Sequence, residues 1–423
     1  MTRYISVHHL NYVLFLVILY IFIYNPPFTF LPLSPIEVLL IPACLYITLL
    51  KKWGNLLKVF LPEIVILSLI ILFSVIREAF ALNIVFLKAN IFLLLQAIIL
   101  PYCLLQVYYK VEKNGNLLKS MILIGSIASV ITLLMLLIPS FGDLVRYDLL
   151  RTDDFTELIA FRTFGLSEGL TFAYGTAQGL ILCLVIYFSR YNTKYLLLFP
   201  LFVLSILFNA RIGLIPVIFA LGYLVILRFN VKIIVFFAFF CVVFYLVIFQ
   251  TNLFSEYAKT IDWAFDFFIQ SSELFEGSSS GPAEGTTFDI LFGDMAVFPQ
   301  RLTEWVVGSG ENVFVSKQAN SDIGYLIYLN YGGIIYLSLY ALFVTCLMLR
   351  LRFLFKEERW FIFLLLVTIL ITSLKGLFIS IIPSFRLLML MYCYLVIENK
   401  KLKKNLSKSY KFNFVDLGTV IKT

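Results

Sequence analysis

The feature that most constrains this chain is a series of apolar runs separated by charged residues, Gly or Pro. About 20 apolar residues in a helix cross the roughly 30 Å of hydrocarbon in a bilayer. Such runs occupy residues 10–24, 35–50, 59–76, 85–108, 119–138, 170–188, 195–209, 212–227, 232–250, 321–349, 360–374 and 377–397. The pattern predicts an all-α, polytopic transmembrane helical bundle of about 12 spans, in which residues 1–423 form a single membrane domain.

Composition agrees with a membrane protein. The chain is 61% hydrophobic and 14% charged, whereas soluble domains carry about 25% charged residues. The net charge of +8 comes from basic residues in short runs between the apolar stretches, and not from one basic face or arm. We therefore expect the lipid bilayer, and not nucleic acid, to be the partner of these charges.

The basic residues also predict an orientation. With the N-terminus in the cytoplasm, about two thirds of the 33 Lys and Arg residues fall on the inner side, as expected for short loops and helix ends. Both termini are then cytoplasmic, and residues 398–423 form a basic cytoplasmic tail. The two long loops, 139–169 and 251–320, are then extracytoplasmic. Connections of this length are usually functional or disordered.

Six of the cations predicted at or near the outer side could converge near one interface. They are Lys88, Arg162, Arg211, Arg301, Lys375 and Arg386. Charges at membrane depth are costly and are usually functional, and Arg and Lys together suit a diphosphate head group. For each residue, an interfacial anchor or a salt bridge to Asp143, Glu168 or Asp322 is the alternative. Arg211 is favoured for ligand contact because its short hairpin cannot lift it clear of the bilayer.

Two carboxylates are candidates for the base that a sugar transfer requires. Glu168 and Asp322 each lie just before a predicted span, where either could take a proton from an attacking hydroxyl. Helix capping or a local salt bridge is the alternative. Both histidines are near the N-terminus, and the chain has no phosphate-binding Gly-rich loop. We therefore expect no metal and no nucleotide cofactor, and a donor that is already activated.

Several short motifs, taken in order and spacing, resemble a known family. They are RTFG at 162–165, FNARIG at 208–213, VGSG at 307–310, SDIGY at 321–325, YGG at 331–333 and LKG at 374–376. This combination is similar to the O-antigen polymerases, the Wzy type. The resemblance covers most of the chain.

That resemblance implies a multi-pass glycosyltransferase of the bacterial inner membrane. Its substrate would be an undecaprenyl-diphosphate-linked oligosaccharide, and the growing glycan would pass to a new lipid-linked repeat unit at the periplasmic face without a metal or other cofactor. It also implies, as partners, a flippase and a chain-length regulator of the same lipopolysaccharide pathway. In the family, outer-loop arginines engage sugar or diphosphate, a role that falls here on Arg162 and Arg211, with Arg301 and Lys375 as further candidates.

Two other functions remain open. The related O-antigen ligases are similar to one another in a histidine near the end of the large loop, where this chain has Ser321 and Asp322, so the polymerase is favoured. A lipid-linked oligosaccharide flippase would share the twelve-span layout. An alternating-access carrier is expected to show two similar halves with a site near the midplane, whereas the loops and charges here gather on one face.

The orientation can be tested with reporter fusions. A reporter placed after Ser279 should be extracytoplasmic and one placed after Lys404 cytoplasmic, because the basic residues alternate in that sense along the chain. Alkaline phosphatase and green fluorescent protein fusions report the two compartments. Finding both positions on one side of the membrane would contradict the twelve-span arrangement.

Overall fold

The fold is all-helical in the part of the chain that the structure describes. This computed structural model describes residues 2–81, 86–112, 115–151, 162–168, 172–227, 295–313, 321–351 and 356–408, with a few isolated residues between 235 and 293. Within those ranges the β pairing is one isolated bridge between Phe28 and Leu150. The predicted all-α class is therefore confirmed.

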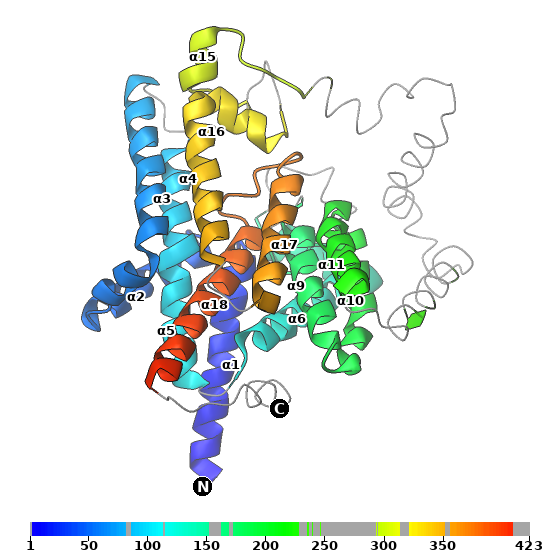
Figure 1. Ribbon diagram of the computed structural model, residues 1–423. Helices are drawn as coiled ribbons and strands as arrows, with labels where there is room; N and C mark the ends of the chain where they lie inside the picture. Colours follow the sequence, from blue (N-terminus) through cyan, green and yellow to red (C-terminus); the bar gives the residue numbers. More distant parts are fainter. Residues whose placement is uncertain are drawn as a thin grey trace.

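Figure 1 shows the helices, coloured in their order along the chain. The first half contains α1 (Thr2–Tyr24), α2 (Pro35–Leu49), α3 (Trp53–Ala81), α4 (Leu87–Leu94), the π-helix η1 (Leu95–Ile99), α5 (Leu100–Val111), α6 (Leu117–Leu137), α7 (Pro139–Asp143) and the π-helix η2 (Leu144–Leu149). The second half contains α9 (Ala173–Ser189), the 3-10 helix η3 (Thr193–Leu198), α10 (Phe199–Leu207), the 3-10 turn η4 (Arg211–Gly213), α11 (Leu214–Leu227), α15 (Leu302–Val307), α16 (Gly324–Leu351), α17 (Lys356–Thr372) and α18 (Pro383–Lys408). The start of α1 and the end of α18 lie at the same end of the molecule, and α15 lies at the opposite end.

The helices overlap the predicted apolar runs wherever those runs are described. The largest difference is in α18, which begins at Pro383 within the predicted run 377–397 and continues to Lys408, into the predicted tail. The predicted break between the runs 195–209 and 212–227 is present, because α10 ends at Leu207 and α11 begins at Leu214 after η4. The predicted span at 232–250, most of the predicted loop 251–320 and the tail beyond Lys408 lie outside the described residues.

One predicted loop begins as helix. Residues 139–149 of the predicted loop 139–169 form α7 and η2. Pro139 occupies the first turn of α7, where its missing N–H costs no hydrogen bond. Arg146 in η2 is buried, and its Nε donates to the carbonyl oxygen of Arg162 at 3.4 Å. This part of the loop therefore supports the segment that follows it.

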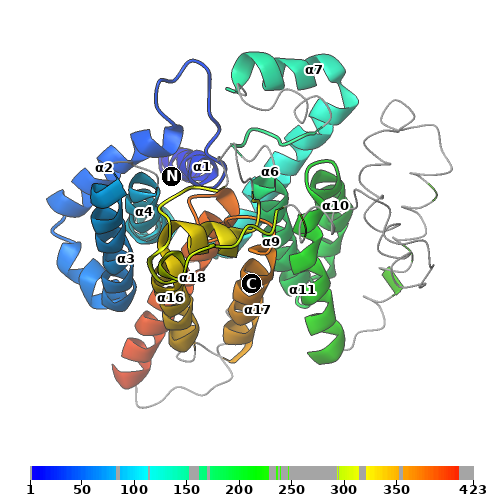
Figure 2. The same cartoon turned by 90° about the horizontal axis from the view of Figure 1, so that it is seen from above.

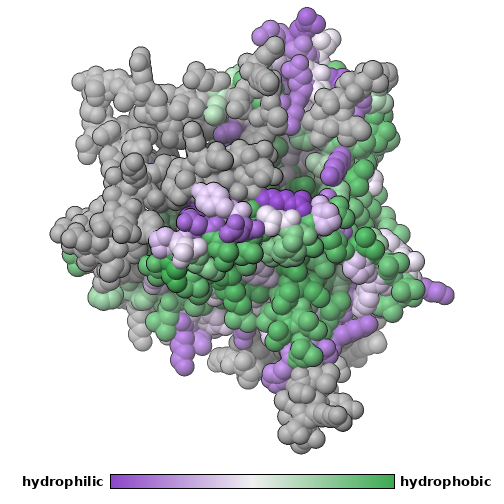
Figure 3. Space-filling model, turned by 180° about the vertical axis from the view of Figure 1, so that it is seen from behind, coloured by the Kyte–Doolittle hydropathy of each residue, from purple (hydrophilic) through white to green (hydrophobic). Residues whose placement is uncertain are grey.

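The surface is that of a membrane protein. In the described residues, the helices long and apolar enough to cross a membrane are Trp53–Ala79, Leu87–Val111, Leu117–Leu137 and Gly324–Arg350. Shorter apolar helices are His9–Tyr24, Pro35–Leu49, Ala173–Ser189, Thr193–Leu207 and Arg211–Gly222. Figure 3 shows a broad belt of hydrophobic surface with hydrophilic side chains along its upper border and below it. Such a belt matches the hydrocarbon layer of a bilayer.

Two helices form the centre of the bundle. In α9 every residue except Tyr187 is buried, and in α18 all residues from Pro383 to Ile397 are buried. They pack against each other, α18 also contacting α1, α5 and α17, and α9 also contacting α6, α10 and α11 (Figure 2). A helix that is apolar on all sides belongs in a core, so these two helices are the frame to which the loops attach.

A close backbone approach fixes the turn that carries Arg211. Gly175 and Gly179, four residues apart on α9, face Ala210 and Gly213 of that turn, and a Cβ on Gly179 would collide with the carbonyl oxygen of Gly213. Small residues with this spacing allow backbones to meet closely within membranes. The Asn209 side chain adds a hydrogen bond, accepting from the Gly175 N–H at 2.9 Å.

Substitution of Gly179 tests this packing. Gly179→Ala should destabilise the protein by about 1–3 kcal/mol, the usual cost of forcing extra atoms into a packed interior. Thermal unfolding of the purified protein in detergent measures the change. The matched control is Gly222→Ala on α11, where a Cβ would meet no atom within 4 Å. Equal stability of the two variants would show that α9 and the Arg211 turn are not tightly packed.

Candidate functional site

The segment that carries Arg162 is attached to the segment that carries Arg211. The backbone N–H of Thr163 donates to the carbonyl oxygen of Phe208 at 3.0 Å, and the Thr163 hydroxyl is 3.3 Å from the same oxygen. Gly165 adopts a positive φ of 56°, a backbone conformation that favours Gly. Arg162 and Arg211 therefore lie on two irregular segments that run beside each other.

A second pair of segments brings Asp322 to Lys375. The N–H of Gly324 donates to the carbonyl oxygen of Ser373 at 3.0 Å. The two backbones approach so closely that a Cβ on Gly324 would collide with the carbonyl oxygen of Gly376. On its other side, Gly376 lies against the ring of Phe172, at the start of α9. The turn that carries Lys375 is thus held between α16 and α9.

These two pairs of segments form one charged cluster, which we call the cationic cluster: Arg162, Arg211, Lys375 and Asp322. Partial burial lowers the pKa of Arg162 to about 10, and the positive charge of Arg211 acts in the same direction. Removal from water also lowers the pKa of Lys375, with Arg211 and Arg162 adding to the effect and Asp322 opposing it. The charges are therefore near enough to act on one another, although Arg162 and Lys375 are more than 200 residues apart in the sequence.

The carboxyl group of the cluster is suited to accept a proton. Desolvation raises the pKa of Asp322 above its ordinary value, and the positive charge of Lys375 opposes the rise. A carboxylate with a raised pKa is a better base at neutral pH. The cluster contains three cations and one carboxylate. Such an arrangement suits a polyanion with a hydroxyl beside it.

Glu168 and Arg386 lie in a different network. The Arg386 side chain is 1% exposed and forms an ion pair with Glu168. It also donates to Gln96 Oε1 at 3.2 Å and to the carbonyl oxygen of Ile23 at 2.9 Å. The Asn25 side chain donates to the other carboxylate oxygen of Glu168. This network connects α1, η1, α18 and the segment after Arg162, so both charges have a structural role here.

Lys88 and Arg301 also lie apart from the cationic cluster. Lys88 is 73% exposed, lies 3.8 Å from Glu37 and sits over the ring of Phe92. Arg301 is 82% exposed at the start of α15, where its guanidinium lies 3.8 Å from Glu304. Of the eight site residues predicted from the sequence, the structure brings together Arg162, Arg211, Lys375 and Asp322.

The sequence reasoning overlooked two buried carboxylates. Glu78 accepts hydrogen bonds from the N–H of Phe86 at 2.6 Å and of Leu87 at 2.8 Å, and from the Tyr331 hydroxyl at 2.9 Å. Its neighbour Arg77 donates to the carbonyl oxygen of Gly308 at 2.8 Å. Glu78 therefore joins α3 to the start of α4 and to α16, and Arg77 attaches the end of the large loop to α3.

The second overlooked carboxylate is Glu63, which is fully buried in α3. It accepts from Arg350 at 3.1 Å and from the Tyr392 hydroxyl at 2.5 Å. This network joins α3, α16 and α18. Both carboxylates could have been found from the sequence, since Glu63 is a charge inside an apolar run and Glu78 follows that run closely.

Comparison with known proteins gives no further assignment. No protein-family model, curated protein or solved structure matches the chain. Among the residues placed by the structure, no group of three or more His, Cys, Asp or Glu side chains gathers as metal ligands do. The function is therefore inferred from the geometry of the cationic cluster.

The Glu168–Arg386 pair predicts a large loss of stability on its disruption. Arg386→Met leaves the Glu168 carboxylate without its ion-pair partner and should destabilise the protein by about 3–5 kcal/mol. In Glu168→Gln/Arg386→Met, part of that stability should return because the unpaired charge is gone. Thermal unfolding in detergent measures both. Arg301→Ala, at an exposed arginine, is the control and should change stability by less than about 0.5 kcal/mol.

Proposed function

We propose that this protein is an O-antigen or surface-polysaccharide polymerase. It would transfer the growing glycan from undecaprenyl diphosphate to a new lipid-linked repeat unit, at the periplasmic face of a bacterial inner membrane. In this proposal the bundle has about 12 spans with both termini in the cytoplasm. The common end at which α1 starts and α18 ends is consistent with that orientation. A flippase and a chain-length regulator would act with it.

The observation that carries the proposal is the cationic cluster. Three cations beside one carboxylate match the two requirements of the reaction, which are a diphosphate leaving group and a hydroxyl nucleophile. Arg162 and Arg211 would bind the diphosphate through their planar guanidinium groups. Lys375 would add a third positive charge near the departing oxygen.

Asp322 would act as the general base. The acceptor hydroxyl oxygen forms a bond to the anomeric carbon of the donor, while the bond from that carbon to the diphosphate oxygen breaks. The hydroxyl proton passes to Asp322, and the negative charge of the leaving diphosphate is held by the cations. The step uses this chain's own residues and needs no metal or nucleotide.

Deleting the gene separates the proposed function from its two alternatives. A polymerase mutant should carry lipid core with a single repeat unit, and a ligase or flippase mutant should carry core with none. Accumulation of precursor that faces the cytoplasm would identify a flippase. Surface polysaccharide separated on a gel gives the first readout.

Exchange of arginine for lysine tests whether the cluster makes specific contacts. Arg162→Lys and Arg211→Lys should lower the polymerisation rate nearly as much as the Ala variants, because one ammonium cannot replace a bidentate guanidinium. Loss of one transition-state donor typically costs about 100-fold to 1000-fold in rate. The measurement is polymer formation in reconstituted membranes with purified lipid-linked repeat units, where the loss should appear in turnover more than in donor binding.

The matched control is Arg190→Ala. Arg190 follows the opposite end of α9 from the cluster, and its guanidinium stacks on Tyr187. The 17 residues of α9 separate it from the cluster by about 25 Å at 1.5 Å per residue. It should retain the wild-type rate. Near-normal rates in both Lys variants would contradict specific contacts and leave general electrostatic attraction as the role of these arginines.

A further inference from the structure

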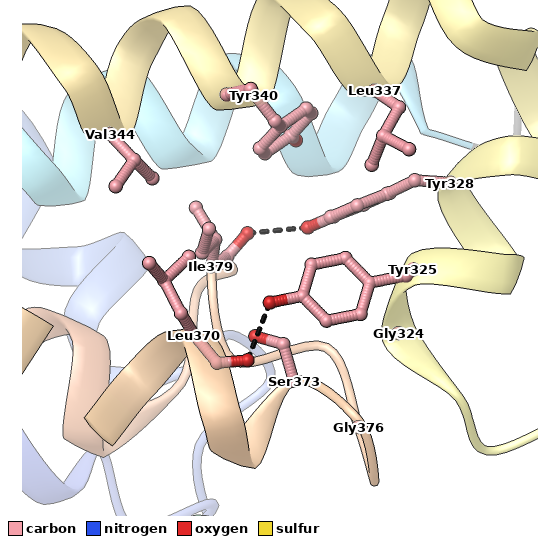
Figure 4. A pocket seen from close by; sticks show the side chains of 11 residues that line it. Gly324, Tyr325, Tyr328, Leu337, Tyr340, Val344, Leu370, Ser373, Gly376 and Ile379 are labelled. Atoms are coloured by element: carbon pink, nitrogen blue, oxygen red, sulfur yellow. Dashed lines mark hydrogen bonds between the residues drawn. The ribbon is translucent and has the colours of Figure 1, made fainter. Parts of the chain in front are cut away.

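An apolar groove lies directly beside the cationic cluster. It runs between α16, α17 and the segment that follows α17, and it has a volume of about 80 Å³. Its lining residues, drawn in Figure 4, are Gly324, Tyr325, Tyr328, Leu337, Tyr340, Ala341, Val344, Leu370, Ser373, Gly376 and Ile379. The cavity is about half the size of the ~150 Å³ cavity that accepts benzene, so it fits a few carbon atoms of a chain.

The polar groups in the groove are already engaged with protein atoms. Tyr325 donates to the carbonyl oxygen of Leu370 at 2.5 Å, and Tyr328 donates to that of Ile379 at 2.6 Å (Figure 4). The third tyrosine, Tyr340, donates to the Asn90 side chain at 2.8 Å. The tyrosines therefore present ring surfaces to the groove, and this surface suits hydrocarbon and not a sugar.

The Ser373 hydroxyl follows the same pattern. It lies just after α17 and donates to the carbonyl oxygen of Ile369, in the last turn of that helix, at 2.8 Å. Gly324 and Gly376 contribute only backbone, which they use in their close approach to each other. A glycan would need hydrogen-bond partners that this lining does not offer.

One side of the groove faces the apolar exterior. Ala341 is exposed, and nearby α16 carries the exposed apolar side chains Ile334 and Ile335. α16 is one of the helices long and apolar enough to cross a membrane. A lipid chain can therefore enter the groove sideways without passing through water.

The other end of the groove reaches the cationic cluster. Gly324 and Tyr325 follow Asp322 along the chain, and Ser373 and Gly376 flank Lys375. A ligand that lies across both features has a negatively charged head and an apolar chain joined to it. The positive charge at this end makes a diphosphate the complementary head group.

We propose that the groove binds the first part of the polyprenyl chain of the lipid-linked diphosphate, next to its head group. This inference rests on the proposed function, since it places the chain of the same substrate. A polyprenyl chain that enters the groove from the bilayer moves out of lipid and not out of water. The groove therefore stabilises the bound chain through van der Waals packing, because no hydrophobic surface is removed from water. Methyl branches and double bonds packed between Tyr325, Tyr328 and Tyr340 hold the diphosphate at the cations. The groove thereby distinguishes a lipid-linked diphosphate from a free one.

Filling the groove tests the proposal. Ala341→Trp places a large ring at its open side, and Ala341→Leu gives a smaller filling that is common on lipid-facing helices. The matched control is Leu342→Trp, at the adjacent residue, which is 48% exposed and outside the groove. Each full-length protein is placed in phospholipid nanodiscs and titrated calorimetrically with farnesyl diphosphate and with inorganic diphosphate.

The expected result is a selective loss. Ala341→Trp should bind farnesyl diphosphate about tenfold more weakly than wild type, with a smaller loss for Ala341→Leu, because each chain atom that no longer packs loses its contacts. Inorganic diphosphate should bind all variants alike, and Leu342→Trp should behave as wild type.

Three results would overturn the proposal: unchanged binding of farnesyl diphosphate to Ala341→Trp, an equal loss for both probes, or no binding to wild type because phospholipid chains fill the groove. The test is independent of catalysis. If the protein binds farnesyl diphosphate selectively but polymerises no repeat units, the proposed lipid groove is supported and the proposed polymerase function is contradicted. If the protein polymerises repeat units normally and Ala341→Trp binds farnesyl diphosphate as wild type does, the polymerase function is supported and the lipid groove is contradicted.

Discussion

The constraint on which this structure depends is that irregular backbone inside a membrane bundle must find its hydrogen-bond partners within the protein. The breaks between helices meet this need by pairing with one another. Thr163 bonds to Phe208, and Gly324 bonds to Ser373. Because these segments carry Arg162, Arg211, Asp322 and Lys375, satisfying the backbone also assembles the cationic cluster.

The other buried charges are neutralised by partners on different helices. Arg386 pairs with Glu168, and Arg350 pairs with Glu63. Breaking a buried pair leaves an uncompensated charge, so these contacts fix how α3, α16 and α18 lie against their neighbours. The cationic cluster differs, because it gathers the three cations Arg162, Arg211 and Lys375 with the carboxylate of Asp322. Cations gathered beside a carboxylate suit an anionic ligand, and this is why we place function there.

The proposed reaction divides its substrate between two adjoining environments. Cations on irregular segments suit a diphosphate, whereas tyrosine rings on α16 suit hydrocarbon. Gly324 and Gly376 lie at the border, where their backbones meet. The absence of side chains there allows charge and hydrocarbon to lie within a few residues of each other. This arrangement would hold a lipid-linked diphosphate at one fixed depth.

The sequence by itself determined the helices, because apolar runs of membrane-spanning length leave the backbone no other way to satisfy its hydrogen bonds. It also indicated Arg162, Arg211, Asp322 and Lys375 as candidate functional residues, because charges near membrane depth are costly. It could not separate them from Glu168, Arg386, Lys88 and Arg301, since periodicity does not report which helices adjoin. Only the tertiary structure decided that Arg386 is paired and Lys375 is clustered, because such contacts join residues hundreds of positions apart and depend on how closely glycine-bearing backbones can pack.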